Sequence, residues 1–178
     1  MTDSESLERA IHEAVALVPH DPQWSPLFKA ERDRLLELFP TQLIQVEHIG
    51  STAIPDIPAK PIIDILAGVE SMATADSLYG PLLDSGYTTS DAFNATLTDR
   101  RWFMRYANGH RTHHLHIVVY GSSIWHQRLS FRDALRADPV LARQYALLKQ
   151  KLATQYHSDR EAYTRAKTDF VRSVVGDG

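Results

Sequence analysis

A single aspartate interrupts an otherwise apolar run at residues 62–67, which read Ile-Ile-Asp-Ile-Leu-Ala. A short apolar run of this kind is typical of a buried strand. Because side chains alternate along a strand, Asp64 points to the opposite face from its two isoleucine neighbours. A carboxylate there is costly unless it binds a hard cation, accepts a proton or forms a structural ion pair. The basic residues considered for such a pair are Lys60, Arg100, Arg101 and Arg105.

Hydrophobic periodicity predicts further elements around this strand. Apolar residues at helical spacing predict helices at residues 3–18, 24–39 and about 74–84. Alternating or continuous apolar runs predict strands at residues 43–49, 62–67, 101–106 and 114–120. From about residue 122 to residue 175 the pattern is that of two or three helices, with breaks near Asp138–Pro139 and around His157–Ser158.

This order of elements predicts an α/β or α+β fold, in which helices flank a small mixed sheet. The turn-forming pair Asn108–Gly109 is expected to join the last two strands. No repeat or linker divides the chain, so we expect one domain over residues 1–178. It is made of an N-terminal helix within residues 1–20, the sheet, and a helical C-terminal part at residues 122–178.

Composition excludes several kinds of site and partner. The chain has no cysteine, so disulfides, thiolate nucleophiles and Cys-ligated zinc are excluded. A formal net charge of −3 argues against a general nucleic-acid binder, whereas a phosphorylated small molecule needs only a few local cations. The N-terminus is polar and acidic, and no apolar stretch approaches the roughly 18 residues of a membrane span. We therefore expect a cytoplasmic protein with no membrane contact.

Gly50 and Ser51 follow the strand expected at residues 43–49. Glycine lets the backbone approach a ligand closely, and Ser51 offers a hydroxyl and its own N–H. If a helix begins here, its free N–H groups and its dipole favour a phosphate. An ordinary turn in which Ser51 or Thr52 caps a helix accounts for the same residues.

Histidines and arginines lie on the last two expected strands. His114 and His116 are two residues apart and therefore face the same side. Beside a carboxylate, two such imidazoles are typical ligands of zinc or another transition metal, or they act as acid–base groups and phosphate contacts. On an edge strand the same pattern simply faces water. Arg101 and Arg105 share a face, so they either flank a phosphate or carboxylate or remain solvated.

Four segments of the sequence together resemble one family. They are VEHIGSTAIPDIPAKPIIDILAGV, THHLHIVVYGS, LSFRDALRADPVLARQYALLKQKLA and AYTRAKTDFV. In this order they are similar to the GrpB family, once called UPF0157, over nearly the whole chain. That family belongs to the nucleotidyltransferase superfamily, so the resemblance implies a nucleotidyltransferase-like fold.

In that superfamily a glycine–serine step precedes a strand that bears two acids separated by one apolar residue. Those acids, often with a third from another strand, hold magnesium at the phosphates of a nucleotide. Gly50 and Ser51 match the step, and Asp64 matches one acid. The possible partner positions, Ile62 and Leu66, are apolar, which puts the two-metal reaction in doubt.

Two functions are compatible with this set. In the first, an enzyme acts on a nucleotide or another phosphorylated or activated small molecule. Asp64, His114 and His116 then bind a divalent metal (Mg, Mn or Zn) or exchange protons. In the second, a nucleotide- or coenzyme A-binding module has kept the pocket and lost catalysis. The residues expected to contact phosphate are Gly50, Ser51, Thr52, Lys60, Arg101 and Arg105.

The segment at residues 132–153 carries apolar residues at helical spacing between charged ones. Amphipathic helices of this kind usually cover a sheet, and they also serve as partner surfaces. Arg132 and Asp133 are further candidates for reaching back towards the pocket.

Overall fold

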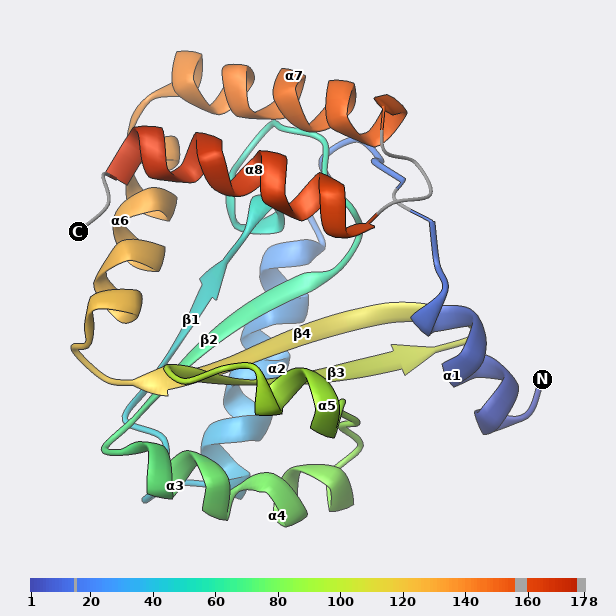
Figure 1. Cartoon of the computed structure of the whole chain (residues 1–178), viewed down its shortest axis with the longest axis vertical. Coiled ribbons are helices and arrows are strands. Elements are labelled where there is room, and N and C mark those ends of the chain that lie inside the picture. Colours follow the sequence, from blue (N-terminus) through green and yellow to red (C-terminus); the bar gives the residue numbers. More distant parts are fainter. Residues whose placement is uncertain (15, 156–159, 176–178) are drawn as a thin grey trace.

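The computed structural model describes residues 1–14, 16–155 and 160–175. Its central layer is a four-stranded mixed sheet with the order β1-β2-β4-β3 (Figure 1). The strands are β1 (Gln45–Ile49), β2 (Ile63–Val69), β3 (Arg100–Ala107) and β4 (His110–Val119). The central pair β2 and β4 is parallel, and both outer pairs are antiparallel. The expected small mixed sheet is therefore confirmed.

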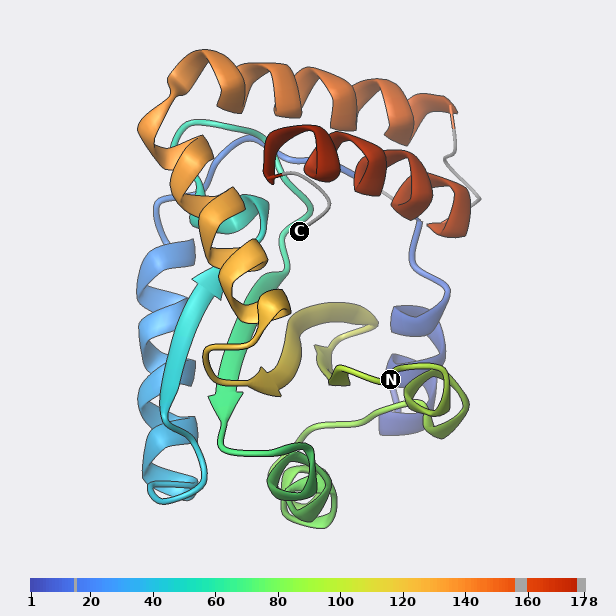
Figure 2. The ribbon, with the colours of Figure 1, turned by 60° about the vertical axis from the view of Figure 1, so that its left-hand side comes forward.

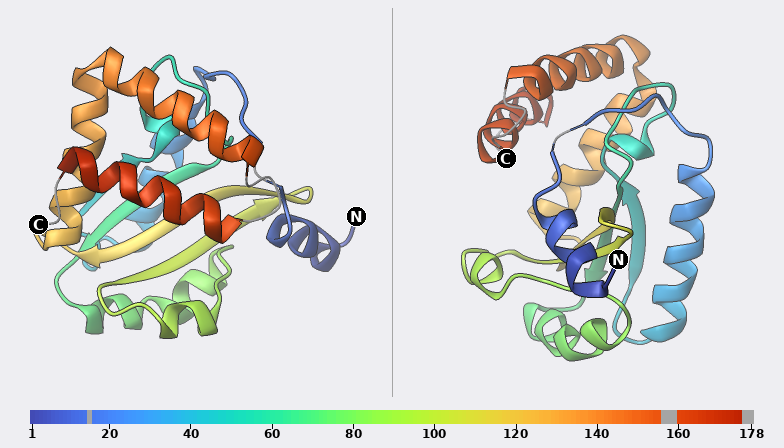
Figure 3. Two further views of the ribbon diagram at one scale, coloured as in Figure 1. Left: turned by 45° about the horizontal axis from the view of Figure 1, so that its top comes forward. Right: turned by 90° about the vertical axis from the view of Figure 1, so that its right-hand side faces the viewer.

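Helices cover both faces of the sheet (Figures 2 and 3). One face is covered by α2 (Trp24–Leu38), α3 (Met72–Ser77) and α4 (Tyr79–Asp84). The other is covered by α6 (Ser123–Ala137), α7 (Pro139–Gln155) and α8 (Arg160–Val175). The remaining elements are α1 (Asp3–Ile11), the 3-10 helix η1 (Ser51–Ala53) and α5 (Asp91–Ala95). None of these described helices is long and apolar enough to cross a membrane.

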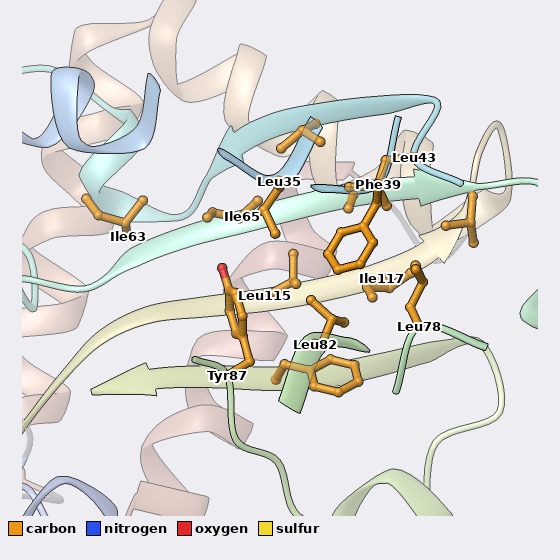
Figure 4. Packing of buried hydrophobic residues seen from close by; sticks show 14 of the residues in the cluster. Leu35, Phe39, Leu43, Ile63, Ile65, Leu78, Leu82, Tyr87, Leu115 and Ile117 are labelled. Atoms are coloured by element: carbon orange, nitrogen blue, oxygen red, sulfur yellow. The ribbon is translucent and has the colours of Figure 1, made fainter. Parts of the chain in front are cut away.

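Alternation along β2 divides the apolar core into two parts. Ile65 packs with Leu35 of α2 in the larger cluster, shown in Figure 4, and we call this side of the sheet the α2 face. Leu66 packs with Trp125 of α6 in a smaller cluster, and we call this side the α6 face. Ile65 and Leu66 are both fully buried. Burial of each such side chain stabilises the fold by about 1.5–3 kcal/mol, so a one-residue slip of β2 would exchange the two faces and is disfavoured.

The boundaries differ from the sequence expectations in three places. The helix expected at residues 3–18 ends at Ile11, and Val18 instead forms a two-way β-bridge with Ala59. The helix expected at residues 74–84 is divided at Leu78, because Pro81 has no N–H to continue the hydrogen-bond ladder. The short helix α5 was not expected from the periodicity.

Other boundaries agree with the sequence. Asn108 and Gly109 form the tight turn between β3 and β4, with φ angles of 52° and 79°. The helical part breaks between α6 and α7 at Asp138, as expected. The second expected break, around His157–Ser158, lies outside the described residues.

A buried ion network ties α2 to the sheet on the α2 face. Glu31, only 4% exposed, accepts hydrogen bonds from Arg34 (2.7 Å), Arg105 (3.0 Å) and the hydroxyl of Tyr87 (2.6 Å). Burial acts to raise the pKa of Glu31, but the hydrogen bonds of Arg34 and Tyr87 and the charge of Arg105 lower it to about 2. The ionised carboxylate therefore stabilises the folded state.

We expect Glu31→Gln to lower the free energy of unfolding by about 3 kcal/mol at neutral pH, because a shift of one pKa unit corresponds to about 1.4 kcal/mol. The pKa of Glu31 falls from 4.5 to about 2 on folding, so this stability is present above pH 4.5 and is lost as the pH falls towards 2. Urea unfolding across this pH range checks it. Asp76→Asn, at an ion pair whose carboxylate is 57% exposed, serves as the control and changes stability by less than about 1 kcal/mol. A difference between Glu31→Gln and the unaltered chain that is the same at every pH contradicts the prediction.

Candidate functional site

Strand register brings three expected site residues together on the α6 face. Asp64 of β2 pairs with His114 of β4, and Leu66 pairs with His116. Asp64, His114 and His116 therefore project from one face, with His116 one row further along β4. The side chains of Asp64 and His114 are 29% and 13% exposed, so the pair is largely buried but still reaches solvent.

The turn after β1 passes directly over the Asp64 carboxylate. Ile49, the last residue of β1, pairs with Asp64, and Gly50 follows with φ at +74°. A Cβ atom on Gly50 would lie 2.3 Å from Oδ2 of Asp64, which is a severe overlap. Only glycine combines this dihedral with this close approach. The group that the backbone of Gly50 approaches in this structure is the side chain of Asp64, and the expected approach to a ligand stays a prediction.

Hydrogen-bond chemistry fixes the tautomer of His114. Its Nε2 lies 3.3 Å from Nη1 of Arg111, and a guanidinium can only donate. Nε2 is therefore the acceptor, and the ring proton resides on Nδ1. This Nδ1 lies 3.4 Å from Oδ1 of Asp64. His114 thus directs its Nδ1–H towards the carboxylate of Asp64, and this contact orients the carboxylate.

The pKa directions describe an ionised acid beside neutral imidazoles. Burial acts to raise the pKa of Asp64, but His114, His116 and Lys167 together hold it well below its usual value. Burial lowers the pKa of His114, and Asp64 restores it only in part. Burial also lowers the pKa of His116, with a further contribution from Arg128. At neutral pH, Asp64 is negative and both histidines are uncharged.

Lys149 of α7 is a site residue that the sequence reasoning missed. It is 2% exposed, and its ammonium group donates a hydrogen bond to the hydroxyl of Ser51. Its Nζ also lies 5.4 Å from the ring centroid of Tyr145. Burial lowers the pKa of Lys149 well below its ordinary value, and the charges of Lys167 and Lys60 lower it further. The signal was present in the sequence, because Lys149 lies on the apolar stripe of α7 that buries Tyr145 and Leu152.

Thr52 and Lys60 have different places around this turn. The buried hydroxyl of Thr52 donates to the carbonyl oxygen of Ile62 and accepts from Nε2 of His48, so it links the turn to its neighbours. Lys60 is half-buried, and its charge acts on both His114 and Lys149. Lys60 therefore lies near the site, whereas the hydroxyl of Thr52 is used in hydrogen bonds within the turn and to β1.

Arg101 and Arg105 do not join the site, contrary to the sequence expectation. Register pairs them with Ile117 and His113 of β4, which places both on the α2 face. Arg101 forms an ion pair with Asp76 at 2.7 Å, and Arg105 forms the ion pair with Glu31. The sequence predicts that the two arginines share one face of a strand, but that face is the α2 face and not the face of Asp64. The β3 side chains on the α6 face belong to Arg100 and Trp102.

Arg132 reaches the sheet, whereas Asp133 does not. Arg132 donates to Glu47 at 2.8 Å and to the carbonyl oxygen of His48 at 3.2 Å, which fastens α6 to β1. Asp133 is 62% exposed and pairs with Arg132 at the surface. Arg136 adds a hydrogen bond to the carbonyl oxygen of Ala53 in η1. These contacts hold the helical layer over the site.

The residues around Asp64 do not match a divalent metal. Within the described ranges, no group of three or more His, Asp or Glu side chains is arranged to hold a metal ion. The expected set of Asp64, His114 and His116 is not assembled as ligands, because the nitrogens of His114 face Asp64 and Arg111.

Residues 14–176 match the family described as GrpB protein. The chain belongs to the GrpB family. It is 35% identical over 167 residues to the glutamate-rich protein GrpB of Alkalihalophilus pseudofirmus, covering 92% of this chain and 95% of that one. The crystal structure of the conserved protein GrpB from Enterococcus faecalis aligns with a TM-score of 0.74 and 30% identity, over 89% of this chain and 98% of that chain.

Other relatives are longer than this chain. It is 35% identical over 160 residues, or 90% of its length, to the UPF0157 protein YqkA of Bacillus subtilis, of which the match spans 46%. It is 32% identical to a dephospho-CoA kinase of Mycolicibacterium paratuberculosis over an alignment of 182 positions, which covers 90% of this chain and 45% of that one. The chain thus spans about half the length of these two relatives.

We expect Gly50→Ala to lower the free energy of unfolding by about 2 kcal/mol or more, because it combines a positive φ with the overlap onto Asp64. Gly80→Ala is the matched control, since a Cβ atom there meets nothing within 4 Å and alanine favours the helix. It should stabilise the chain by about 0.5–1 kcal/mol. Chemical denaturation measures both. Adding Asp64→Ala to Gly50→Ala should recover part of the loss, and additive effects of the two changes would contradict the contact.

Proposed function

We propose that this chain binds a nucleotide or another phosphorylated small molecule on the α6 face and acts on it as a nucleotidyltransferase-like enzyme. The observation that carries the proposal is the buried ammonium of Lys149 at the hydroxyl of Ser51. Lysine is almost never fully buried without an anionic partner. Lys149 forms no ion pair with a carboxylate of the described residues. A phosphate at Ser51 supplies that partner.

Neighbouring charges support the same ligand class. Burial has the largest effect on the pKa of Lys149 and lowers it. The charges of Lys167 and Lys60 lower this pKa further, so both act on Lys149. Asp64 is the carboxylate among these ammonium groups, and its charge opposes theirs only in part. Ammonium groups gathered near Lys149 favour an anion with several charges, such as a polyphosphate.

The uncharged histidines supply the proton chemistry of the proposed reaction. Asp64 holds the Nδ1–H of His114, as an orienting carboxylate does. The Nδ1 atom of His116 is buried and has no hydrogen-bond partner among the described residues. In the proposed reaction His116 takes up a proton from the bound ligand at this nitrogen. The lysines neutralise the charge that develops on the leaving group.

Binding without turnover is a second candidate function, and one observation favours it. Ile62 and Leu66, where a second acid would stand beside Asp64, are 3% and 0% exposed and belong to the core. A site of this kind can hold a phosphorylated ligand and lack the charge arrangement for transfer. The dephospho-CoA kinase relatives make coenzyme A a further candidate ligand of such a module.

Ligand-dependent stability of the full chain tests the binding site. Each nucleoside triphosphate is added alone and with Mg²⁺, Mn²⁺ or Zn²⁺, and unfolding is followed in urea. A ligand at a hundred times its dissociation constant stabilises the folded state by about 2.7 kcal/mol. We expect Lys149→Met to abolish this gain and to stabilise the ligand-free chain, because it removes a buried charge. Lys151→Met, at an exposed position of the same helix, should retain the gain. Equal stabilisation of the Lys149→Met and unaltered chains by every nucleotide would contradict the proposed site.

Product formation then separates the two functions. An enzyme forms product from a stabilising nucleotide, and both Asp64→Asn and His116→Ala reduce the rate. A binding module shows the same stabilisation with no product, and Asp64→Asn leaves the affinity largely intact. Any turnover that depends on Asp64 contradicts the function of binding without catalysis.

A further inference from the structure

Two arginines on the α6 face lie beyond the Asp64–His114 pair along the sheet, and Arg100 is two rows away. Arg100 of β3 pairs with Val118, and its neighbour on the same face, Trp102, pairs with His116. Arg128 of α6 is one turn after Trp125, which packs in the apolar cluster with Val118. The same sheet-facing side of α6 therefore directs Arg128 to the row that contains His116.

Neither guanidinium has a hydrogen bond or an ion pair in the part of the chain that the structure describes, although both side chains are half-buried. Arg101, the sequence neighbour of Arg100, is bound to Asp76, and Arg132, one turn after Arg128, is bound to Glu47. The fold therefore pairs the adjacent arginines and leaves these two without an anion.

The charge of Arg100 acts on Arg128, whereas the charge that acts on Arg100 is that of Asp99. Burial lowers the pKa of Arg128, and the charge of Arg100 lowers it further. Asp64 and Asp99 act on Arg128 only at longer range, since neither forms an ion pair with it. The charges of Arg128 and Arg100 also lower the pKa of His116, after the larger effect of burial. Half-buried like charges without a partner destabilise a fold unless a ligand provides the opposite charge.

We propose that Arg100, Arg128 and His116 form a second anion subsite, which takes a phosphate or a similar dianionic group of the same ligand. The two guanidiniums supply N–H groups that match the oxygens of a phosphate. His116 contributes its buried, unpartnered Nδ1 atom, which bonds a protonated phosphate oxygen or takes up a proton with the ligand. This proposal rests on the proposed function for the identity of the ligand.

The second subsite defines the substrate class more closely. His116 is two residues beyond His114 along β4, which separates the rows by roughly 7 Å. The first subsite is centred on Ser51 and Lys149, and the second on the arginines. The ligand therefore carries two anionic groups, one for each subsite, such as a nucleotide with a phosphate at each of two positions.

Inorganic phosphate and the full chain suffice to test the subsite. The Lys149→Met change removes the first subsite, and the total ionic strength is kept constant with chloride. At a phosphate concentration ten times its dissociation constant, the ratio of folded to unfolded Lys149→Met chain should rise about elevenfold. Adding Arg128→Gln or Arg100→Gln should abolish this rise. Adding Arg101→Gln, the matched control on the α2 face, should retain it.

A second readout separates ligand binding from a structural role. Without phosphate, Arg128→Gln and Arg100→Gln should each raise the melting temperature, because they relieve repulsion, whereas Arg101→Gln should lower it by breaking the pair with Asp76. The subsite is overturned if phosphate does not stabilise the Lys149→Met chain, or if it stabilises that chain equally with and without Arg128. The first of these results does not contradict the proposed binding site at Ser51 and Lys149, because the Lys149→Met chain lacks that site. An arginine-dependent rise supports the subsite even where no nucleotide binds at Lys149.

Discussion

The carboxylate of Asp64 lies where a turn, a neighbouring strand and the helical layer meet. Gly50 passes so close above it that no side chain fits, and His114 directs an N–H towards it from the side. A half-buried charge in a core strand is tolerated only with such partners. The register of β1, β2 and β4 is what brings these groups together, and the apolar packing of both faces fixes that register.

The C-terminal helices add cations to this acid. Lys149 is carried to Ser51 because Tyr145 and Leu152 bury the same stripe of α7. Arg128 is carried towards His116 because Trp125 packs against the sheet. A nucleotidyltransferase-like arrangement with several acids would use bound metal to neutralise phosphates. In this chain Ile62 and Leu66 are apolar and buried, and in the function that we propose lysines and arginines neutralise the phosphates.

The sequence predicts the sheet and the shared face of His114 and His116, and the reasons are local. Alternation within a strand predicts that His114 and His116 share one face. It also predicts that Asp64 points away from the face of its isoleucine neighbours in β2. Alternation does not say which face of one strand matches which face of the next, so it does not reveal that Arg101 and Arg105 lie on the α2 face. The contact between Lys149 and Ser51 could not be predicted from local sequence patterns, because the two residues are far apart in the chain and only tertiary packing joins them. The early end of α1 depended on another distant contact, between Val18 and Ala59.

The central claim is that Lys149 is a buried, uncompensated cation that receives the anionic group of the ligand. NMR titration of the lysine side chains, with Lys149 identified by its loss in Lys149→Met, tests this most directly. The account predicts one lysine whose pKa lies well below the ordinary value in the free protein and rises when a nucleoside triphosphate is added. If Lys149 titrates like the exposed lysines, or if its titration is the same with and without the nucleotide, the account is contradicted.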